Sequence, residues 1–137
     1  MREVELHLEG RGIEPDTVRA AVAALEADRY LDDARYARRF AEDRRALDRW
    51  GSERIEQALR ERGVEREHVA AALAALAEGD GESELESAVA LLRRRFPAAL
   101  EDLRARDRAL GVLVRKGYEL ELAHDALRAH DRALAES

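Results

Sequence analysis

The side chains that most often perform chemistry are few in this sequence and are badly spaced for it. There are four histidines, His7, His68, His124 and His130, and no two of them have the i, i+4 spacing of metal ligands on a helix. Asp32 and Asp33 diverge by roughly 100° on a helix, so they do not form an acid–base pair. No serine lies in a nucleophile elbow, and Lys116, the only lysine, is not part of a phosphate-binding loop. We therefore predict a non-catalytic protein with neither metal nor cofactor.

Arginine is the chemically versatile residue that gathers in groups. Residues 35–54 hold seven arginines against four acids, a net charge of +3, in a chain whose net charge is −6. These arginines are Arg35, Arg38, Arg39, Arg44, Arg45, Arg49 and Arg54. Later basic clusters contribute Arg93, Arg94, Arg115 and Lys116. Guanidinium groups suit bidentate contact with carboxylates or phosphates, so these residues predict a partner-binding surface. A solvated helix face is the alternative, and Trp50 beside the cluster is a core anchor or, less favoured, an interface anchor.

Composition restricts the class of protein. Charged residues make up 39% of the 137 residues and aromatic residues only 4%, so a core must be built from Ala, Leu and Val. With two prolines in the whole chain, this composition predicts an all-α fold. The absence of cysteine makes a reducing cytoplasm the simplest setting. No apolar run approaches the roughly 20 residues that span a bilayer, so we predict no membrane contact. The negative net charge argues against nucleic-acid binding by bulk attraction.

A pattern of five apolar positions occurs three times, around Gly12, Gly63 and Gly117. The middle copy has Leu59, Val64, Val69, Leu73 and Leu76; the first has Leu8, Ile13, Val18, Val22 and Leu25; the third has Leu113, Tyr118, Ala123, Leu127 and His130. The histidine at the last position predicts an exposed edge there. Repeated units of this length predict a helical-repeat fold in which each glycine ends a helix.

The repeat divides the chain into units. We predict the last two helices of an incomplete first repeat at 1–29, a three-helix repeat at 30–78, an acidic glycine-rich linker at 79–83 and a third repeat at 84–137. Asp32 should cap the first helix of the second repeat, and helices should begin at Pro15 and after Glu65 and Glu119. Pro97 should stop the first helix of the third repeat.

The first repeat has only eleven residues before Gly12, so we expect it to lack its first helix, either because the sequence begins late or because the protein has lost that helix. Apolar residues such as Leu6, Val18 and Val22 would then be exposed and could pair with another copy. We favour a monomer, with a dimer through the incomplete first repeat as the alternative.

Four short segments occur in an informative order. They read Leu-Asp-Asp-Ala-Arg-Tyr-Ala-Arg-Arg-Phe at 31–40, Gly-Ser-Glu-Arg-Ile at 51–55, Leu-Arg-Glu-Arg-Gly-Val at 59–64 and Leu-Val-Arg-Lys-Gly-Tyr at 113–118. This order resembles the signature of RecX regulatory proteins, with Tyr36 at the usual aromatic position and Arg62 at the usual lysine. The residues that carry the motif, with the neighbouring tryptophan, are Asp32, Asp33, Tyr36, Phe40, Trp50, Gly51, Ile55, Leu59, Gly63 and Gly117.

The resemblance implies tandem three-helix units, similar to helix-turn-helix units, in an elongated curved array. It also implies a non-catalytic regulator that lodges in the groove of RecA–single-stranded-DNA filaments. Such a protein inhibits the ATPase, strand-exchange and coprotease activities of RecA and so modulates recombinational DNA repair and the SOS response. RecA is then the expected partner, and single-stranded DNA is a further candidate.

Two other functions are open. Residues 51–76 have roughly the shape of a DNA-binding helix-turn-helix module, although the final helix, 67–76, has no Arg, Asn or Gln to read base edges. The chain could also be a helical-repeat scaffold for another protein.

Overall fold

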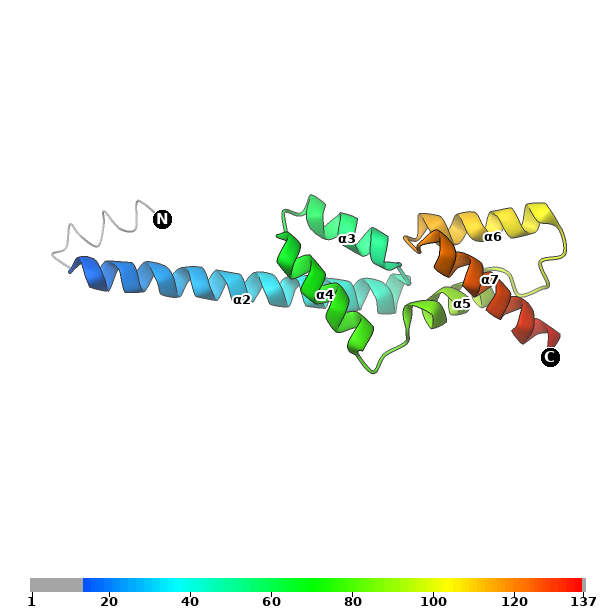
Figure 1. The fold of residues 1–137 in the computed structure, drawn as a ribbon, viewed down its shortest axis with the longest axis horizontal. Coiled ribbons are helices and arrows are strands. Elements are labelled where there is room, and N and C mark those ends of the chain that lie inside the picture. The colour runs from blue at the N-terminus through cyan, green and yellow to red at the C-terminus, as the bar shows by residue number, and fades with distance from the viewer. Residues whose placement is uncertain (1–13, 137) are drawn as a thin grey trace. The chain divides into compact units, whose positions relative to one another are not determined.

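A computed structural model of the chain describes residues 14–136. The regular elements in this range are all α-helices: α2 (Pro15–Asp48), α3 (Ser52–Glu61), α4 (Arg66–Glu78), α5 (Glu84–Arg95), α6 (Leu103–Arg115) and α7 (Leu120–Ala135) (Figure 1). The predicted all-α class is therefore confirmed. The chain forms two compact parts, Met1–Tyr36 and Ala37–Ser137, and α2 contributes residues to both. The turn predicted at Gly12 lies outside the described residues.

The helix α2 is continuous for 34 residues, so the predicted helix start at Asp32 is wrong. The sequence has neither glycine nor proline between Pro15 and Gly51. Once a helix has been nucleated, each further residue adds a hydrogen bond, and a potential capping side chain does not interrupt it. Asp32 instead pairs with Arg35 at 3.7 Å, with both side chains largely exposed, and Asp33 is exposed on the same helix.

Val18 and Val22, the two valines of the first compact part that we expect to be exposed, are buried. The exposed fractions of Val18 and Val22 are 2% and 8%, whereas Leu25 is 52% exposed. Leu6 lies outside the described residues. The expectation of an exposed apolar face at Val18 and Val22 is therefore wrong, and these two residues give no support to a dimer through the first repeat.

The middle three-helix bundle consists of the second half of α2 with α3 and α4. Its buried residues include Ala37, Ala41, Ile55, Leu59 and Val69, and these form one apolar cluster. Gly63 has φ +80° at the turn between α3 and α4, a conformation that favours glycine. The next helix begins directly after Glu65, as predicted. Small Ala side chains on α2 allow the three helices to approach closely.

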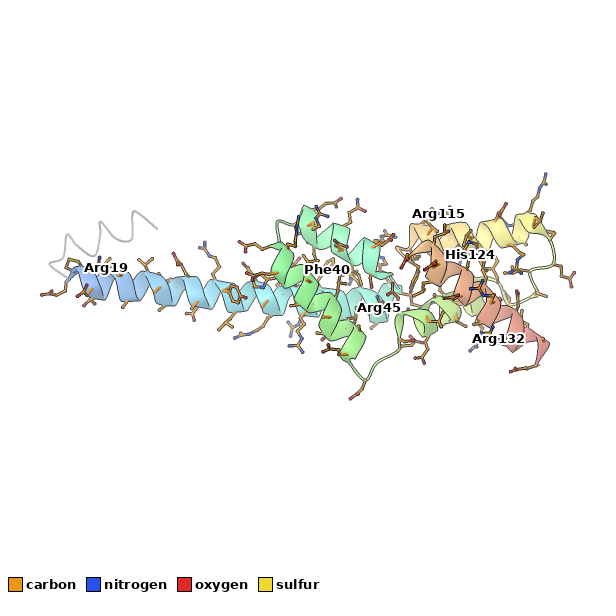
Figure 2. The ribbon with its side chains drawn as sticks, viewed as in Figure 1. Arg19, Phe40, Arg45, Arg115, His124 and Arg132 are labelled. Carbon is orange, nitrogen blue, oxygen red and sulfur yellow. The ribbon has the colours of Figure 1, made fainter. Side chains whose placement is uncertain are left out.

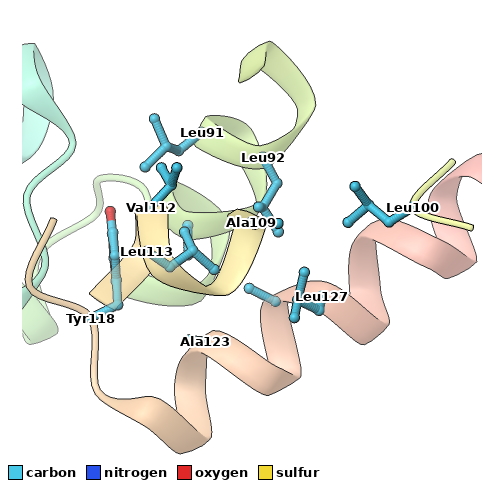
Figure 3. Close-up of a cluster of buried hydrophobic side chains, with 11 residues drawn as sticks. Leu91, Leu92, Leu100, Ala109, Val112, Leu113, Tyr118, Ala123 and Leu127 are labelled. Carbon is cyan, nitrogen blue, oxygen red and sulfur yellow. The ribbon is translucent and has the colours of Figure 1, made fainter. Parts of the chain in front are cut away.

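The C-terminal bundle consists of α5, α6 and α7. A capping box starts α5, because the Ser83 side chain accepts from the Glu86 amide and the Glu86 carboxylate accepts from the Ser83 amide. The helix ends at Arg95, two residues before Pro97, and α7 begins after Glu119, both as predicted. The apolar cluster of this bundle runs from Tyr118 at one end to Leu100 at the other (Figure 3).

His130 is buried in this bundle, so the predicted exposed edge is wrong. The residue is 1% exposed, and its Nε2 lies 2.9 Å from the carbonyl oxygen of Phe96. The loop that follows α5 covers this end of the bundle, since Leu100 is only 7% exposed and belongs to the apolar cluster. The imidazole thus links α7 to the end of α5, a contact between segments far apart in the chain.

The two bundles meet backbone to backbone at Gly51 and Gly117. The Gly51 amide donates to the Lys116 carbonyl at 2.7 Å, and the Glu53 amide donates to the Gly117 carbonyl at 3.0 Å. A Cβ atom on Gly51 would lie 2.4 Å from the Gly117 carbonyl, and one on Gly117 would lie 2.3 Å from the Cβ of Arg54. Only glycine at both positions permits this approach. We call this contact the glycine joint.

Replacing Gly117 with Ala should destabilise the chain more than replacing Gly63 with Ala. Both glycines have positive φ, +98° and +80°, which costs an alanine about 1–2 kcal/mol. A Cβ at Gly63 meets nothing within 4 Å, whereas at Gly117 it collides with Arg54. Overpacking at Gly117 should therefore cost about 1–3 kcal/mol more. Urea unfolding of both variants measures the difference, and equal losses would contradict the steric role of the joint.

Candidate partner-binding surface

The chain turns sharply between α2 and α3, and a buried arginine holds this turn in place. Arg45 is 6% exposed; its Nε donates to the Trp50 carbonyl at 2.7 Å, and its Nη2 donates to Ser52 Oγ at 3.1 Å. A buried guanidinium needs such acceptors, because an unsatisfied one would be costly. Figure 2 labels this residue near the C-terminal end of α2. The structure therefore gives Arg45 a positioning role, which differs from the partner contact predicted for it.

Glu84, the first residue of α5, and Glu82, just before that helix, complete the turn. The Glu84 carboxylate accepts from the Ser52 amide at 3.0 Å and from the Ser52 hydroxyl at 2.9 Å. It therefore caps α3 from the other bundle, where its charge also suits the positive end of the helix. Glu82 pairs with Arg49 at 2.6 Å. Residues 79–83 lie between α4 and α5, and the contacts of Glu82 and Glu84 hold the two bundles together.

Tyr118 stabilises an unusual backbone conformation at the end of α2. Arg49 is the one described non-glycine residue with a positive φ, 54°, which is unfavourable for a side chain with a Cβ atom. The Tyr118 hydroxyl donates to the Arg49 carbonyl at 2.6 Å and lies 2.8 Å from Ser87 Oγ. Lys116 Nζ donates to the neighbouring Asp48 carbonyl at 3.2 Å. Lys116 and Arg49, both predicted to bind a partner, are thus engaged within the chain.

Three arginines and two aromatic rings form a row beside this turn. Arg54 lies over the Trp50 ring at 4.2 Å, and Arg62 lies over the Phe40 ring at 4.6 Å, measured from the guanidinium carbon to the ring centroid. The guanidinium carbon of Arg44 lies near both rings, 5.9 Å from the Trp50 centroid and 5.8 Å from the Phe40 centroid. The two rings meet edge to face with centroids 6.2 Å apart. We call this row the arginine–aromatic ladder.

Trp50 packs into the middle bundle and is also partly exposed. The ring packs against the apolar cluster of the middle bundle, so Trp50 is a core residue. It is also partly exposed and carries Arg54 on its face. Arg62, which the sequence suggests only as a motif position, belongs to the same row. Glu82, Glu84 and Arg62 are the residues of this region that sequence reasoning missed, because their partners are distant in the chain.

The remaining predicted basic residues are exposed. In the second compact part they are Arg38, Arg39, Arg93, Arg94 and Arg115. None of these side chains takes part in an ion pair with the described residues. In the first compact part, Arg35 is exposed beside Asp32. The structure therefore separates arginines that build the turn from arginines that are available to a partner.

Potential metal-binding side chains do not gather in the part of the chain that the structure describes. Within residues 14–136 there is no group of three or more His, Asp or Glu side chains that could hold a metal ion. His68 and His130 are buried apart in different bundles, and His124 is exposed. Over the same residues, no helix is long and apolar enough to cross a bilayer.

These features define a class: an all-helical protein of three-helix bundles that are joined through glycine turns and carry exposed arginines. Residues 32–73 match the family model described as RecX, second three-helix domain. The chain is 39% identical over 119 residues to Regulatory protein RecX of Xanthomonas axonopodis pv. citri. This alignment covers 86% of this chain and 70% of that protein. It is 34% identical to Regulatory protein RecX of Stenotrophomonas maltophilia, over 93% of this chain and 76% of that protein.

A more distant relative gives the same result. The chain is 31% identical over 127 residues to Regulatory protein RecX of Mycobacterium avium, over 91% of this chain and 73% of that protein. The chain therefore belongs to the RecX family of regulatory proteins, and the resemblance noted from its motifs is confirmed.

Tyr118→Phe should weaken the turn and change the alkaline stability of the chain. The loss of a buried hydroxyl that bridges Ser87 and the Arg49 carbonyl should cost about 1–3 kcal/mol at pH 7. Burial raises the pKa of Tyr118 above its ordinary value of 10.0. The folded chain therefore keeps a proton that the unfolded chain releases. The associated stability is full below pH 10 and is lost as the pH rises towards the folded pKa.

Denaturant unfolding from pH 7 to 11 tests this prediction. The alkaline decline should be shallower in Tyr118→Phe than in the unsubstituted chain. Tyr36→Phe, at a ring that is 47% exposed, is the matched control and should leave the decline unchanged. A decline of the same steepness in all three proteins would show that Tyr118 does not control it.

Proposed function

We propose that this chain is a non-catalytic regulator that binds RecA–single-stranded-DNA filaments. By binding, it inhibits the ATPase, strand-exchange and coprotease activities of RecA and thereby modulates recombinational repair and the SOS response in the cytoplasm. RecA is the principal partner, single-stranded DNA within the filament is a secondary one, and the chain acts as a monomer.

Membership of the RecX family is the observation that carries this proposal. The relatives are named regulatory proteins, and the match extends over most of this chain. Joined helical bundles suit such a role, because stacked units present an extended surface to a partner. The glycine joint, with the bonds of Arg45, Glu84 and Tyr118, supports such a surface by tying the bundles together.

The exposed arginines are the proposed points of contact. Arg38 and Arg39 lie on α2, Arg93 and Arg94 lie near the end of α5, and Arg115 ends α6. Each guanidinium can bind a carboxylate or a phosphate through two parallel hydrogen bonds. Arg45 and Lys116 act indirectly by positioning the turn.

The geometry disfavours the helix-turn-helix alternative. In such modules the second helix enters the major groove and places polar side chains against base edges. Here that helix is α4, whose middle and last turns expose mainly Ala70, Ala71, Ala74 and Ala77. Alanine methyl groups contact thymine methyls but do not distinguish the other bases. The exposed charged side chains of α4 are Arg66 and Glu67 in the first turn and Glu78 at the last position.

Measurement of ATP hydrolysis by RecA on single-stranded DNA tests the proposal. Added folded chain should lower the rate of hydrolysis in a saturable way at or below stoichiometric amounts. Bovine serum albumin at the same concentration should have no effect. If the rate remains unchanged at a severalfold excess of folded chain, the proposed inhibition is wrong.

The double variant Arg38→Glu/Arg39→Glu should weaken inhibition with little effect on folding. Both side chains are exposed and make no ion pair with the described residues, so their reversal removes no internal contact. The concentration for half-inhibition should rise about tenfold, mainly through slower association. Arg104→Glu/Arg108→Glu, a matched double reversal on α6, is the control. Equal effects in both variants would indicate a response to net charge alone.

A further inference from the structure

The arginine–aromatic ladder has two cations that the chain itself leaves available. Arg44 is neutralised by Asp48 at 2.5 Å. Arg54 and Arg62 instead donate to backbone carbonyls, those of Arg115 at 3.4 Å and Ala58 at 3.2 Å. Neither takes part in an ion pair with the described residues. The two ends of the ladder therefore carry positive charge that no acidic side chain of residues 14–136 neutralises directly.

Stacking prepares these two guanidinium groups for a planar ligand. A guanidinium that lies over a ring is held in one orientation and loses part of its hydration on that face. Its N–H groups still point outward in the plane of the group, where they match the two oxygens of a carboxylate. Because Trp50 and Phe40 already orient Arg54 and Arg62, less side-chain freedom is lost when a ligand binds.

The same stacking makes the ladder a poor platform for nucleic-acid bases. Proteins that bind single strands stack bases on open aromatic faces. Here Arg54 covers Trp50, Arg62 covers Phe40, and Arg44 lies beside both rings. A base could stack only after displacing a guanidinium.

We propose that the arginine–aromatic ladder binds carboxylate side chains of an acidic segment on the protein component of the filament, and that it does not bind the DNA. This inference rests on the proposed function and specifies the chemistry of its partner. Trp, Phe and Arg in one partly buried row match the composition of the residues that dominate binding at protein interfaces. Arg54 and Arg62 supply the contacts to carboxylates, and Trp50 and Phe40 act as positioning residues.

Binding of the labelled chain to RecA filaments and to the same DNA without RecA tests this inference. Arg54→Gln/Arg62→Gln should weaken filament binding about tenfold and leave binding to bare single-stranded DNA unchanged. Arg54→Lys/Arg62→Lys keeps both charges but loses the planar fork, so it should also weaken filament binding severalfold. Arg104→Gln/Arg108→Gln, which removes two charges from α6, should change filament binding less than twofold. Circular dichroism verifies that each variant keeps its helix content.

Two results would overturn the inference while leaving the proposed function intact. Unchanged filament binding in Arg54→Gln/Arg62→Gln would show that the ladder is not used. A parallel loss of binding to bare DNA would show that the ladder contacts nucleic acid. Full recovery of filament binding by the lysine variant would reduce its role to that of a simple positive charge and would contradict recognition by a planar fork.

If the unsubstituted chain does not bind filaments at all, the proposed function is wrong. A second measurement then tests separately whether the arginine–aromatic ladder binds carboxylates. Trp50 is the only tryptophan, so its fluorescence reports directly on the ladder. A ten-residue glutamate peptide should change the emission in a saturable way, and Arg54→Gln/Arg62→Gln should abolish this change. Decathymidylate and inorganic phosphate should have little effect at the same concentrations. The absence of a response to the peptide, or a stronger response to decathymidylate, would overturn the inference.

Discussion

The backbone contact between Gly51 and Gly117 is the constraint on which the second compact part of the chain depends. Two hydrogen bonds cross it, and neither glycine has room for a Cβ atom. Because the bundles approach so closely there, other groups come within bonding distance. Glu84 reaches the start of α3, and the Tyr118 hydroxyl reaches the carbonyl of the strained Arg49. A wider separation would leave these buried and partly buried polar groups without their partners, at a cost that the apolar clusters would have to offset.

This joint also divides the arginines into two kinds. Arg45 and Arg49 are held by acceptors that exist only because the bundles meet or the chain turns there. Arg38 and Arg39, a few residues earlier on the same helix, have no such acceptors and remain exposed. Arg54 is intermediate, since its Cβ lies against the glycine joint while its guanidinium lies on Trp50. One residue type therefore serves as structural support, aromatic cover and available contact, and the surroundings decide which.

Predictions from the sequence succeeded where the determining interactions are local. The helix ends at Gly63 and Gly117, the helix starts after Glu65 and Glu119 and the helix end before Pro97 all follow from a few adjacent residues. The helix start at Asp32 failed although it too is a local feature, because a capping signal competes with the continuation of an existing helix. His130 failed for a different reason: the loop after α5 folds over it, and no neighbour of His130 in the chain signals that contact.

The amino-acid sequence by itself determined the all-α class, the positions of the helix-ending glycines in the described residues, and the family, because periodicity and motif order are properties of neighbouring residues. It also determined that basic residues concentrate between 35 and 54. Only the tertiary structure decided which arginines are available, that Glu82 and Glu84 hold the turn between α2 and α3, and that Arg62 joins Trp50 and Phe40 in one row. Burial and pairing arise between segments that are dozens of residues apart in the sequence. These segments come into contact only when the chain has folded.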